Sequence, residues 1–465
     1  MKQEFAGNKN TYYDNSGKIS DNLYSFDVEN HKINDEAIYD FLLYGTILPP
    51  NSPFHDIHAM FPGEKIEYNK VSQKYNKSND EYQELAHTKI NYLWSVDKFA
   101  SKLDNIFENY FQEEIINNKL ISIMLSGGVD SSIISSYLPK NTVTATWAGW
   151  GTSTTDLTYS RIIAKHFNLA EPLISKANFL SDLELYKECI QKLKHPIPFG
   201  YIAFAQMAKN VQKKFNNEHG AIFMGQNADT IAGSFKSIAY THYLSKLNHL
   251  WPFLTPYFKK KALKARKYYL LSTTNPIEIK SFFHSNGINP GTWINVPNNY
   301  FDKKYNQIKN QLKLNPWWYK HYILIDELMT GARRDQYAQN QLPALYNIQT
   351  LVPFYNKEVV RLFLSVPQRI RRRSKFGKVI LKELARKRNV PEEIIIKKKK
   401  GLAYGFKDLI AKEEHLPIWC EMEKNDILNK YIDIKKIRAK SENNFATFEI
   451  LISLHYFFKL VLNKS

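Results

Sequence analysis

Residues 120–125 read LISIML, and residues 126–132, which follow directly, read SGGVDSS. A short, continuous apolar run is typical of a strand buried on both faces of a parallel sheet. The glycines after it predict a tight turn, and residues 131–138 predict a helix. A buried strand, a glycine turn and a helix in this order predict an α/β fold with a ligand site at the turn.

The chain on both sides of this stretch continues the same alternation. Further strands are predicted at residues 142–147, 171–175 and 221–224, and further helices at 157–167, 180–193 and 201–215. This order predicts a parallel sheet with right-handed crossovers. Beyond residue 236 the apolar spacing is mostly helical, and the aromatic tail at residues 445–462 is predicted to be a packed amphipathic helix.

A chain of 465 residues is too long for one ordinary core, so we expect two domains. The sequence pattern changes at Ser95, where a region rich in Asn, Lys, Asp and Tyr gives way to apolar residues at helical spacing. Ser95 is a predicted N-cap for a helix that reaches Asn118. We therefore predict a small α+β domain at residues 1–94 and the parallel-sheet domain at 95–465. Within the first, we expect strands at 23–26 and 65–68, a helix at 35–44 and a boundary loop at 70–80.

The formal net charge is +19, which fits a solvated basic face, an anionic substrate such as ATP, or RNA. Dense basic runs occur at residues 369–378 and 397–400, where the ordinary interpretation is a surface coat. The two cysteines, Cys189 and Cys420, have no metal-like spacing and indicate a reducing, cytoplasmic setting. We find no apolar leader and no window long enough to span a bilayer, so no membrane partner is expected.

The glycine turn has the chemistry of a phosphate site. Gly127 and Gly128 allow backbone N–H groups to face an anion at the start of a helix. The loop also offers the hydroxyls of Ser126, Ser131 and Ser132. Asp130 beside a phosphate requires a cation between them, and Mg²⁺ is commonly held by carboxylates and phosphates together. A plain strand–turn–helix with capping residues is the alternative. The stretch is not a Walker loop, because no Lys follows its last glycine.

The stretch SGGVDSS resembles the pyrophosphate loop of the N-type ATP pyrophosphatases. Six other segments, in the same order and spacing, resemble the asparagine synthetase family: 37–45, 54–63, 224–235, 351–354, 377–382 and 391–401. That family includes β-lactam synthetases and lasso-peptide macrolactam cyclases. The resemblance covers residues 37 to 410 and implies a HUP-like parallel-sheet domain with a helical C-terminal part, after a truncated amidotransferase-like domain. It further implies ATP-dependent adenylation of a carboxylate, pyrophosphate release and attack by an amine.

The resemblance also implies roles for single residues. Pyrophosphate would be held by Ser126, Gly127, Gly128, Asp130, Ser131 and Ser132, and adenosine would be bordered by Leu125, Trp147, Met224 and Gly225. Asp130 and Asp229 would hold Mg²⁺. Lys378 would reach the phosphates, and Lys399 would stabilise the charge that develops as the adenylate forms. Lys397 and Lys400 are expected to face solvent.

The chain also departs from the family. No cysteine lies near the N-terminus, and the amidotransferase-like part matches only the last third of that domain, so we expect no glutaminase activity. Gln226 stands where asparagine synthetases have Glu and β-lactam synthetases have Tyr, and an amide cannot take a proton. Thr230, Gln349 and Leu351 replace family residues of the substrate pocket. We therefore expect a pocket not shaped for aspartate, with the amine supplied by the substrate, by ammonia or by a partner protein.

Several functions remain open at this point. The favoured one is amide formation on a small-molecule or peptide carboxylate, with peptide macrolactam formation fitting well because it needs no glutaminase. Ammonia- or partner-dependent asparagine or uronamide synthesis is a second. A tRNA-modifying pyrophosphatase is a third, which the charge favours and the downstream motifs oppose, so nucleic acid is not the expected partner. A nucleotide-binding scaffold and an inactive paralogue complete the set.

Overall fold

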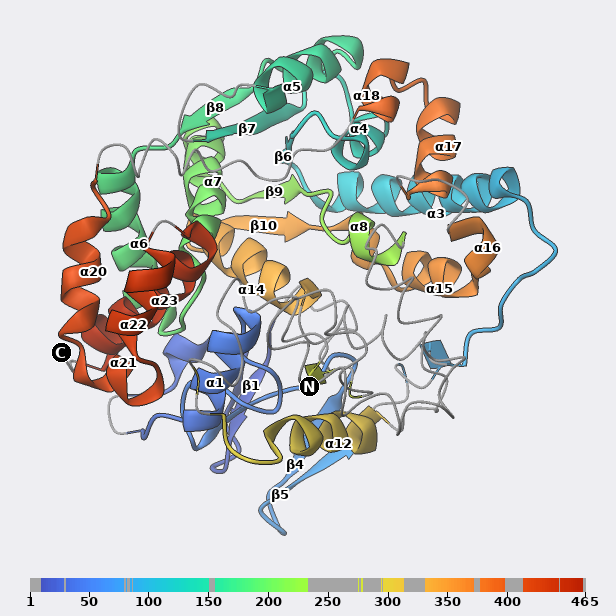
Figure 1. Ribbon diagram of the computed structural model, residues 1–465. Coiled ribbons are helices and arrows are strands. Elements are labelled where there is room, and N and C mark those ends of the chain that lie inside the picture. The colour runs from blue at the N-terminus through green and yellow to red at the C-terminus, as the bar shows by residue number, and fades with distance from the viewer. Residues whose placement is uncertain are drawn as a thin grey trace.

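The structure is a computed structural model (Figure 1). It describes residues 10–28, 31–78, 81, 84, 85, 87–149, 155–232, 275, 277, 278, 294, 296–312, 331–371, 377–397, 413–442 and 444–462. Within these residues, we find no helix that is both long enough and apolar enough to cross a bilayer.

A five-stranded parallel sheet forms the centre of the molecule (Figure 1). Its strands are β6 (Ile121–Met124), β7 (Val143–Gly149), β8 (Leu173–Lys176), β9 (Gly220–Phe223) and β10 (Ile348–Leu351). They lie in the order β10-β9-β6-β7-β8, and every pairing is parallel. The order reverses between β6 and β9, so the carboxyl ends of these two strands flank a topological switch point, where α/β folds place their ligands.

Alternate residues of each strand face opposite sides of the sheet, and each side has its own core. Ile123 and Leu125 join one apolar cluster, whereas Met124 joins the other. On the Leu125 side lie α3 (Val96–Asn117), α4 (Val129–Ser135), α5 (Thr155–His166), α15 (Lys357–Ser365), α17 (Val379–Lys387) and α18 (Glu392–Ile396). On the Met124 side lie α6 (Phe179–Leu193), α7 (Ile202–Lys214), α14 (Gly331–Ala344) and α23 (Phe445–Val461). The predicted α/β parallel-sheet class is confirmed.

The predicted strands and helices around the sheet are confirmed with small shifts at their ends, whereas two predictions nearer the N-terminus are wrong. Residues 23–26 contain a 3₁₀ turn, η1 (Leu23–Ser25), in place of a strand. The predicted loop at 70–80 contains a strand, β5 (Lys74–Ser78), which pairs antiparallel with β4 (Lys65–Asn69). This hairpin is polar and mostly exposed, so its sequence carries no apolar alternation.

The N-terminal region packs against the C-terminal helices. It contains a sheet of β1 (Tyr12–Asp14), β2 (Ile19–Ser20) and β3 (Ile57–Ala59), and the helix α1 (Asp35–Tyr44). Its buried residues belong to the same apolar cluster as α23, with the rings of Phe54 and Phe457 6.1 Å apart. The predicted C-terminal helix is confirmed as a packed helix, but the prediction that it is amphipathic is wrong. It is buried on nearly all sides, because eleven of its residues are inaccessible.

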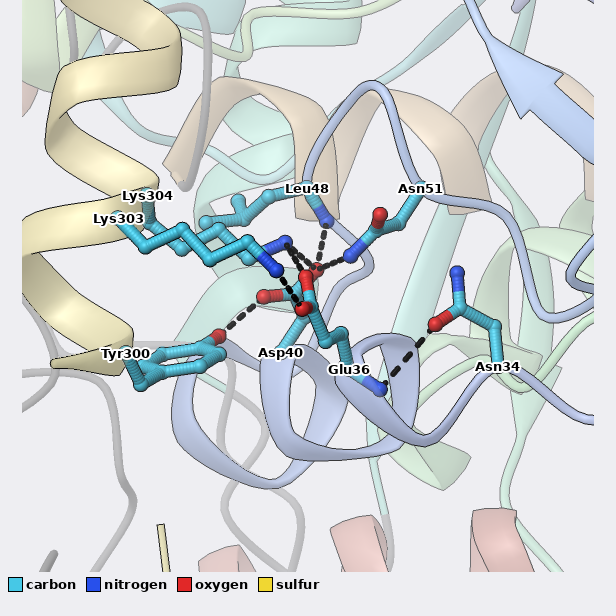
Figure 2. Close-up of polar contacts among 8 residues, drawn as sticks. All are labelled: Asn34, Glu36, Asp40, Leu48, Asn51, Tyr300, Lys303 and Lys304. Carbon is cyan, nitrogen blue, oxygen red and sulfur yellow. Dashed lines mark hydrogen bonds and ion pairs between the residues drawn. The ribbon is translucent and has the colours of Figure 1, made fainter. Parts of the chain in front are cut away.

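A buried ion pair joins α1 to α12 (Tyr300–Leu312), as Figure 2 shows. The carboxylate of Asp40 is fully buried and lies 3.1 Å from the ammonium of Lys304, which is 1% exposed. The same carboxylate accepts hydrogen bonds from the Leu48 amide, the Asn51 side chain and the Tyr300 hydroxyl. Because both oxygens of Asp40 accept hydrogen bonds and its charge is paired with Lys304, this pair meets the condition under which a buried charge is tolerated.

Candidate active site

The phosphate-loop candidate lies at the carboxyl end of β6. The Leu125 amide still pairs with Ala145 of β7 at 2.8 Å, and the chain then turns sharply. Gly127 has a φ of +63°, and a Cβ built on it would lie 2.3 Å from the Cβ of Tyr159 on α5. Only glycine fits this conformation and this close approach. The turn therefore needs a glycine at 127 on structural grounds.

The loop serines bond within the loop. The hydroxyls of Ser131 and Ser132 both donate to the carbonyl of Gly128, at 3.1 and 2.9 Å. The hydroxyl of Ser126 lies 3.2 Å from that of Ser131. These contacts fix the turn. The predicted donation of these hydroxyls to phosphate remains a prediction.

A second turn, at the end of β9, meets the phosphate loop. The Met224 amide pairs with Leu351 at 2.9 Å, and a Cβ on Gly225 would lie 3.1 Å from both the Asp130 Cβ and the Ser131 amide. The two turns are thus in contact across the switch point between β6 and β9. Asn227 has a φ of +71° and starts the short helix α8 (Ala228–Ile231), which carries Asp229 in its first turn.

Lys378 joins the two acidic residues that were predicted to hold metal. Its ammonium lies 2.5 Å from Asp130 Oδ2 and 2.7 Å from Asp229 Oδ1. Lys378 is buried and has a left-handed backbone (φ +58°) at the start of α17. Residues distant in sequence are therefore brought together at the end of the sheet.

The two carboxylates fit a divalent cation. Asp130 Oδ1 is buried and has no hydrogen-bond partner among the described residues, so this oxygen is available to a cation. In the part of the chain that the structure describes, we find no cluster of three or more metal-ligating His, Cys, Asp or Glu side chains. A pair of carboxylates is the usual protein contribution to a magnesium site that phosphates complete.

The residues expected to border adenosine divide between the two faces of the sheet. Trp147 and Met224 are both buried in the cluster on the Met124 side. The side chain of Leu125 is buried in the cluster on the opposite side, so at this position it is the backbone that could face a ligand. The sequence could not distinguish these faces without the strand register.

Gln226 is hydrogen-bonded to a cluster of polar side chains that the sequence does not predict. Its amide nitrogen donates to Asp335 Oδ2 at 2.6 Å. Asp335 Oδ1 accepts from the Tyr201 hydroxyl and, at 3.2 Å, from Arg334 Nε. Glu449, on α23, is held by the Gly200 amide and lies close enough to Arg334 for their charges to interact; its burial raises its pKa to about 7. No motif surrounds Asp335, so only the fold reveals it.

The two basic runs are not simply a solvated coat. Arg371 is buried and donates to the Ile231 carbonyl at 2.8 Å, which holds the end of α8. The ammonium of Lys397 lies 3.6 Å from the centre of the Tyr159 ring, and this side chain is only partly exposed. The expectation that Lys397 faces solvent is therefore wrong, because the Tyr159 ring covers one side of it. Lys399 and Lys400 lie outside the described residues.

A family model described as asparagine synthase matches residues 102–449. No curated protein matches the chain. The matched range includes the phosphate loop, the turn after β9, the two carboxylates and Lys378.

Proposed function

Because the chain belongs to the asparagine synthase family, we propose that it adenylates a substrate carboxylate with ATP and joins it to an amine. The family implies an ATP-using ligase with the HUP-like fold. The products of the proposed reaction are an amide, AMP and pyrophosphate. We further propose that the protein has no glutaminase activity of its own. We propose that it binds a carboxylate and an amine as substrates and that it does not act on nucleic acid.

One observation carries this proposal. Asp130 and Asp229, from the loops after β6 and β9, converge on one ammonium beside a glycine turn. Carboxylates gathered beside an anion-binding turn make sense when a cation and a polyphosphate share the site. An apolar or purely structural turn has no need of such a pair.

Each residue has a proposed task. Asp130 and Asp229 would hold Mg²⁺, which supplies charge neutralisation to the departing pyrophosphate. The turn at Gly127 and Gly128 would orient the phosphates through backbone N–H groups. Lys378, which lies between the two carboxylates, would contribute its positive charge to the same phosphates. Lys399 would stabilise the adenylate and the tetrahedral species that follows.

The cysteines support the absence of glutamine hydrolysis. Cys189 is buried in α6, and its burial raises the pKa of its thiol to about 12, so it is not a nucleophile at neutral pH. Cys420 is on the exposed side of α20 (Leu416–Glu423), beside Arg438. An amine that belongs to the substrate itself, as in peptide macrolactam formation, fits a ligase of this kind. Ammonia and a partner protein are the other sources.

Product analysis tests the proposal. The purified protein is incubated with ATP, Mg²⁺ and hydroxylamine, which traps adenylates, against a panel of carboxylates: aspartate, glutamate and short peptides with Asp or Glu side chains. We expect AMP and pyrophosphate to form with at least one carboxylate. Production of ADP and phosphate would contradict adenylation. Release of glutamate from added glutamine would contradict the absence of a glutaminase.

A further inference from the structure

Helix α14 carries two buried glutamines to which the proposed reaction gives no task. Gln336 is 8% exposed and Gln339 is 1% exposed, although glutamine usually faces solvent. The helix packs against α7 and β10, and the Gln339 carbonyl accepts a hydrogen bond from the Thr350 hydroxyl on β10 at 2.6 Å. The two glutamines are therefore enclosed by the fold and do not belong to its outer surface.

The side-chain amides of these glutamines are not fully paired. Among the described residues, neither the oxygen nor the nitrogen of the Gln339 side chain has a hydrogen-bond partner, and the Gln336 nitrogen has none either. Burial of an unpaired amide costs free energy, and nearly all buried polar groups in proteins are hydrogen-bonded. Two such amides on one helix therefore favour a role in binding a ligand over a role in stability.

The glutamines lie one helical turn or less from the turn that follows β9. Residues three and four apart on a helix share one face, so Gln339 lies on the same face as Gln336 and Asp335. The Asp335 carboxylate accepts from the Gln226 amide at 2.6 Å, and the preceding Gly225 packs on the phosphate loop. Asp335 is partly exposed, whereas the two glutamines are buried, so this face of α14 leads inward from the turn.

The unpaired atoms match a peptide backbone. A glutamine side chain has an acceptor oxygen and an NH₂ donor, and in Gln339 both are unpaired. A carboxylate can satisfy only the donor and an ammonium only the acceptor, whereas a peptide amide supplies both partners. Gln336 adds a donor for a second carbonyl. Side chains three apart on a helix have Cβ atoms about 5–6 Å apart, close to the ~6.5–7 Å between alternate carbonyls of an extended chain.

We propose that Gln336 and Gln339 bind the backbone of a peptide whose Asp or Glu side chain is the carboxylate that the enzyme adenylates. This rests on the proposed function and makes its substrate a peptide, in contrast to a free amino acid. The peptide enters beside Gln226, and its backbone amides become the partners of the two glutamines. Because both side chains are buried, they rotate toward this entrance when the peptide binds, a change that is common at binding surfaces.

The test compares a peptide with a free amino acid. Calorimetry measures the binding of N-acetyl-Gly-Asp-Gly-amide and of aspartate, each with Mg²⁺ and α,β-methylene-ATP, which cannot be cleaved to AMP. We expect the peptide to bind at least ~10-fold more tightly than aspartate. Gln339→Met should weaken peptide binding by ~10-fold, as the loss of one or two net hydrogen bonds predicts, and leave aspartate binding unchanged. Gln336→Met should act in the same direction with a smaller effect, because it removes one donor.

The melting temperature distinguishes a binding role from a structural role. Methionine is similar in volume to glutamine and has no group that needs a partner, so Gln339→Met should keep or raise the melting temperature. The matched control is Gln307→Met on α12, because the Gln307 side-chain oxygen is also buried without a partner among the described residues. This variant should leave peptide binding unchanged.

Two results would overturn the proposal. One is a lower melting temperature of Gln339→Met with unchanged peptide binding, which would make the amide structural. The other is aspartate binding as tight as that of the peptide. If Gln339→Met does not fold, the peptide binding of Gln336→Met decides. Because binding is measured without turnover, a protein that binds the peptide but forms no AMP with it would contradict adenylation and leave the peptide site in place.

Discussion

The ammonium of Lys378 lies 2.5 Å from the carboxylate of Asp130, although 248 residues separate them in the chain. The same ammonium reaches Asp229 at 2.7 Å. A single positive charge therefore holds together two negative ones at the point where β6 and β9 end. A magnesium ion brought by ATP could take over part of that task, and the lysine would then be available to the phosphates.

Replacement of Lys378 tests this relationship. Lys378→Ala leaves two carboxylates facing each other without their cation, and removal of one partner of a buried pair typically costs about 3–5 kcal/mol. We expect a large fall in melting temperature that millimolar Mg²⁺ partly restores, together with a loss of pyrophosphate release. The measurement is thermal unfolding with and without MgCl₂.

The matched control is Lys387→Ala on the same helix. Lys387 pairs with Asp97, whose side chain is 65% exposed, and solvent screens such surface pairs so that they contribute little to stability. Its melting temperature should change little, with no special response to Mg²⁺. If Mg²⁺ shifts all three proteins equally, the two carboxylates do not form the cation site.

The two loop glycines should respond differently to alanine. Gly127→Ala places a Cβ in a left-handed residue, 2.3 Å from the Tyr159 Cβ, and the backbone conformation alone costs about 1–2 kcal/mol. At Gly128 the φ is −92° and the nearest atom to a new Cβ is Ser126 Oγ at 3.4 Å. We therefore expect Gly127→Ala to lose ATP binding and stability, and Gly128→Ala to keep its melting temperature. ATP-induced thermal shifts measure both, and equal behaviour would contradict this loop geometry.

The ion pair under α1 should be strongly coupled. Lys304→Met leaves Asp40 charged and buried, which should cost about 3–5 kcal/mol in the free energy of unfolding. Adding Asp40→Asn removes that charge and should recover much of the loss. Lys303→Met, on the neighbouring exposed pair with Glu36, should cost less than about 1 kcal/mol. Denaturant unfolding of the wild type, Lys304→Met, Asp40→Asn and the double variant gives the coupling energy, and additive effects would show that the two charges do not interact.

Lys399 and Lys397 should differ in the kind of effect they have. Lys399→Ala should lower amide formation by ~10²–10³-fold with little change in melting temperature, because it removes charge stabilisation from the transition state. Lys397→Ala loses the contact with the Tyr159 ring, which is worth about 0.5–2 kcal/mol. It should lower stability with a smaller effect on turnover. Similar losses of turnover in both variants would contradict the role given to Lys399.

The central fold could be predicted because its signals are local. A buried strand such as residues 120–125, with the glycine turn after it, can be identified from about a dozen consecutive residues. The sequence does not predict the last strand, β10. Its four residues, Ile-Gln-Thr-Leu, are too few to show an apolar pattern typical of a strand. The pairing of β9 with β6 depends on contacts between distant segments. That pairing is what brings Asp229 to Asp130.

In the candidate site, too, local motifs could be predicted from the sequence, whereas contacts between distant segments could not. Motifs identified Asp130, Asp229 and Lys378 as candidates, and the structure shows them in contact. Asp335 has no motif, and its relation to Gln226 exists only once α14 is packed against the sheet. The face to which Leu125 points could not be assigned before the strand register was known.

The contact between Phe54 and Phe457 has a consequence for how the molecule is made. The two rings share one apolar cluster, yet about 400 residues of synthesis separate them. At the usual translation rate of ~5–20 residues per second, the aromatic surface around α1 stays uncovered for roughly 20–80 s before α23 leaves the ribosome. During that interval the nascent chain presents bare hydrophobic surface, so we expect it to depend on chaperones that shield such surfaces until translation is complete.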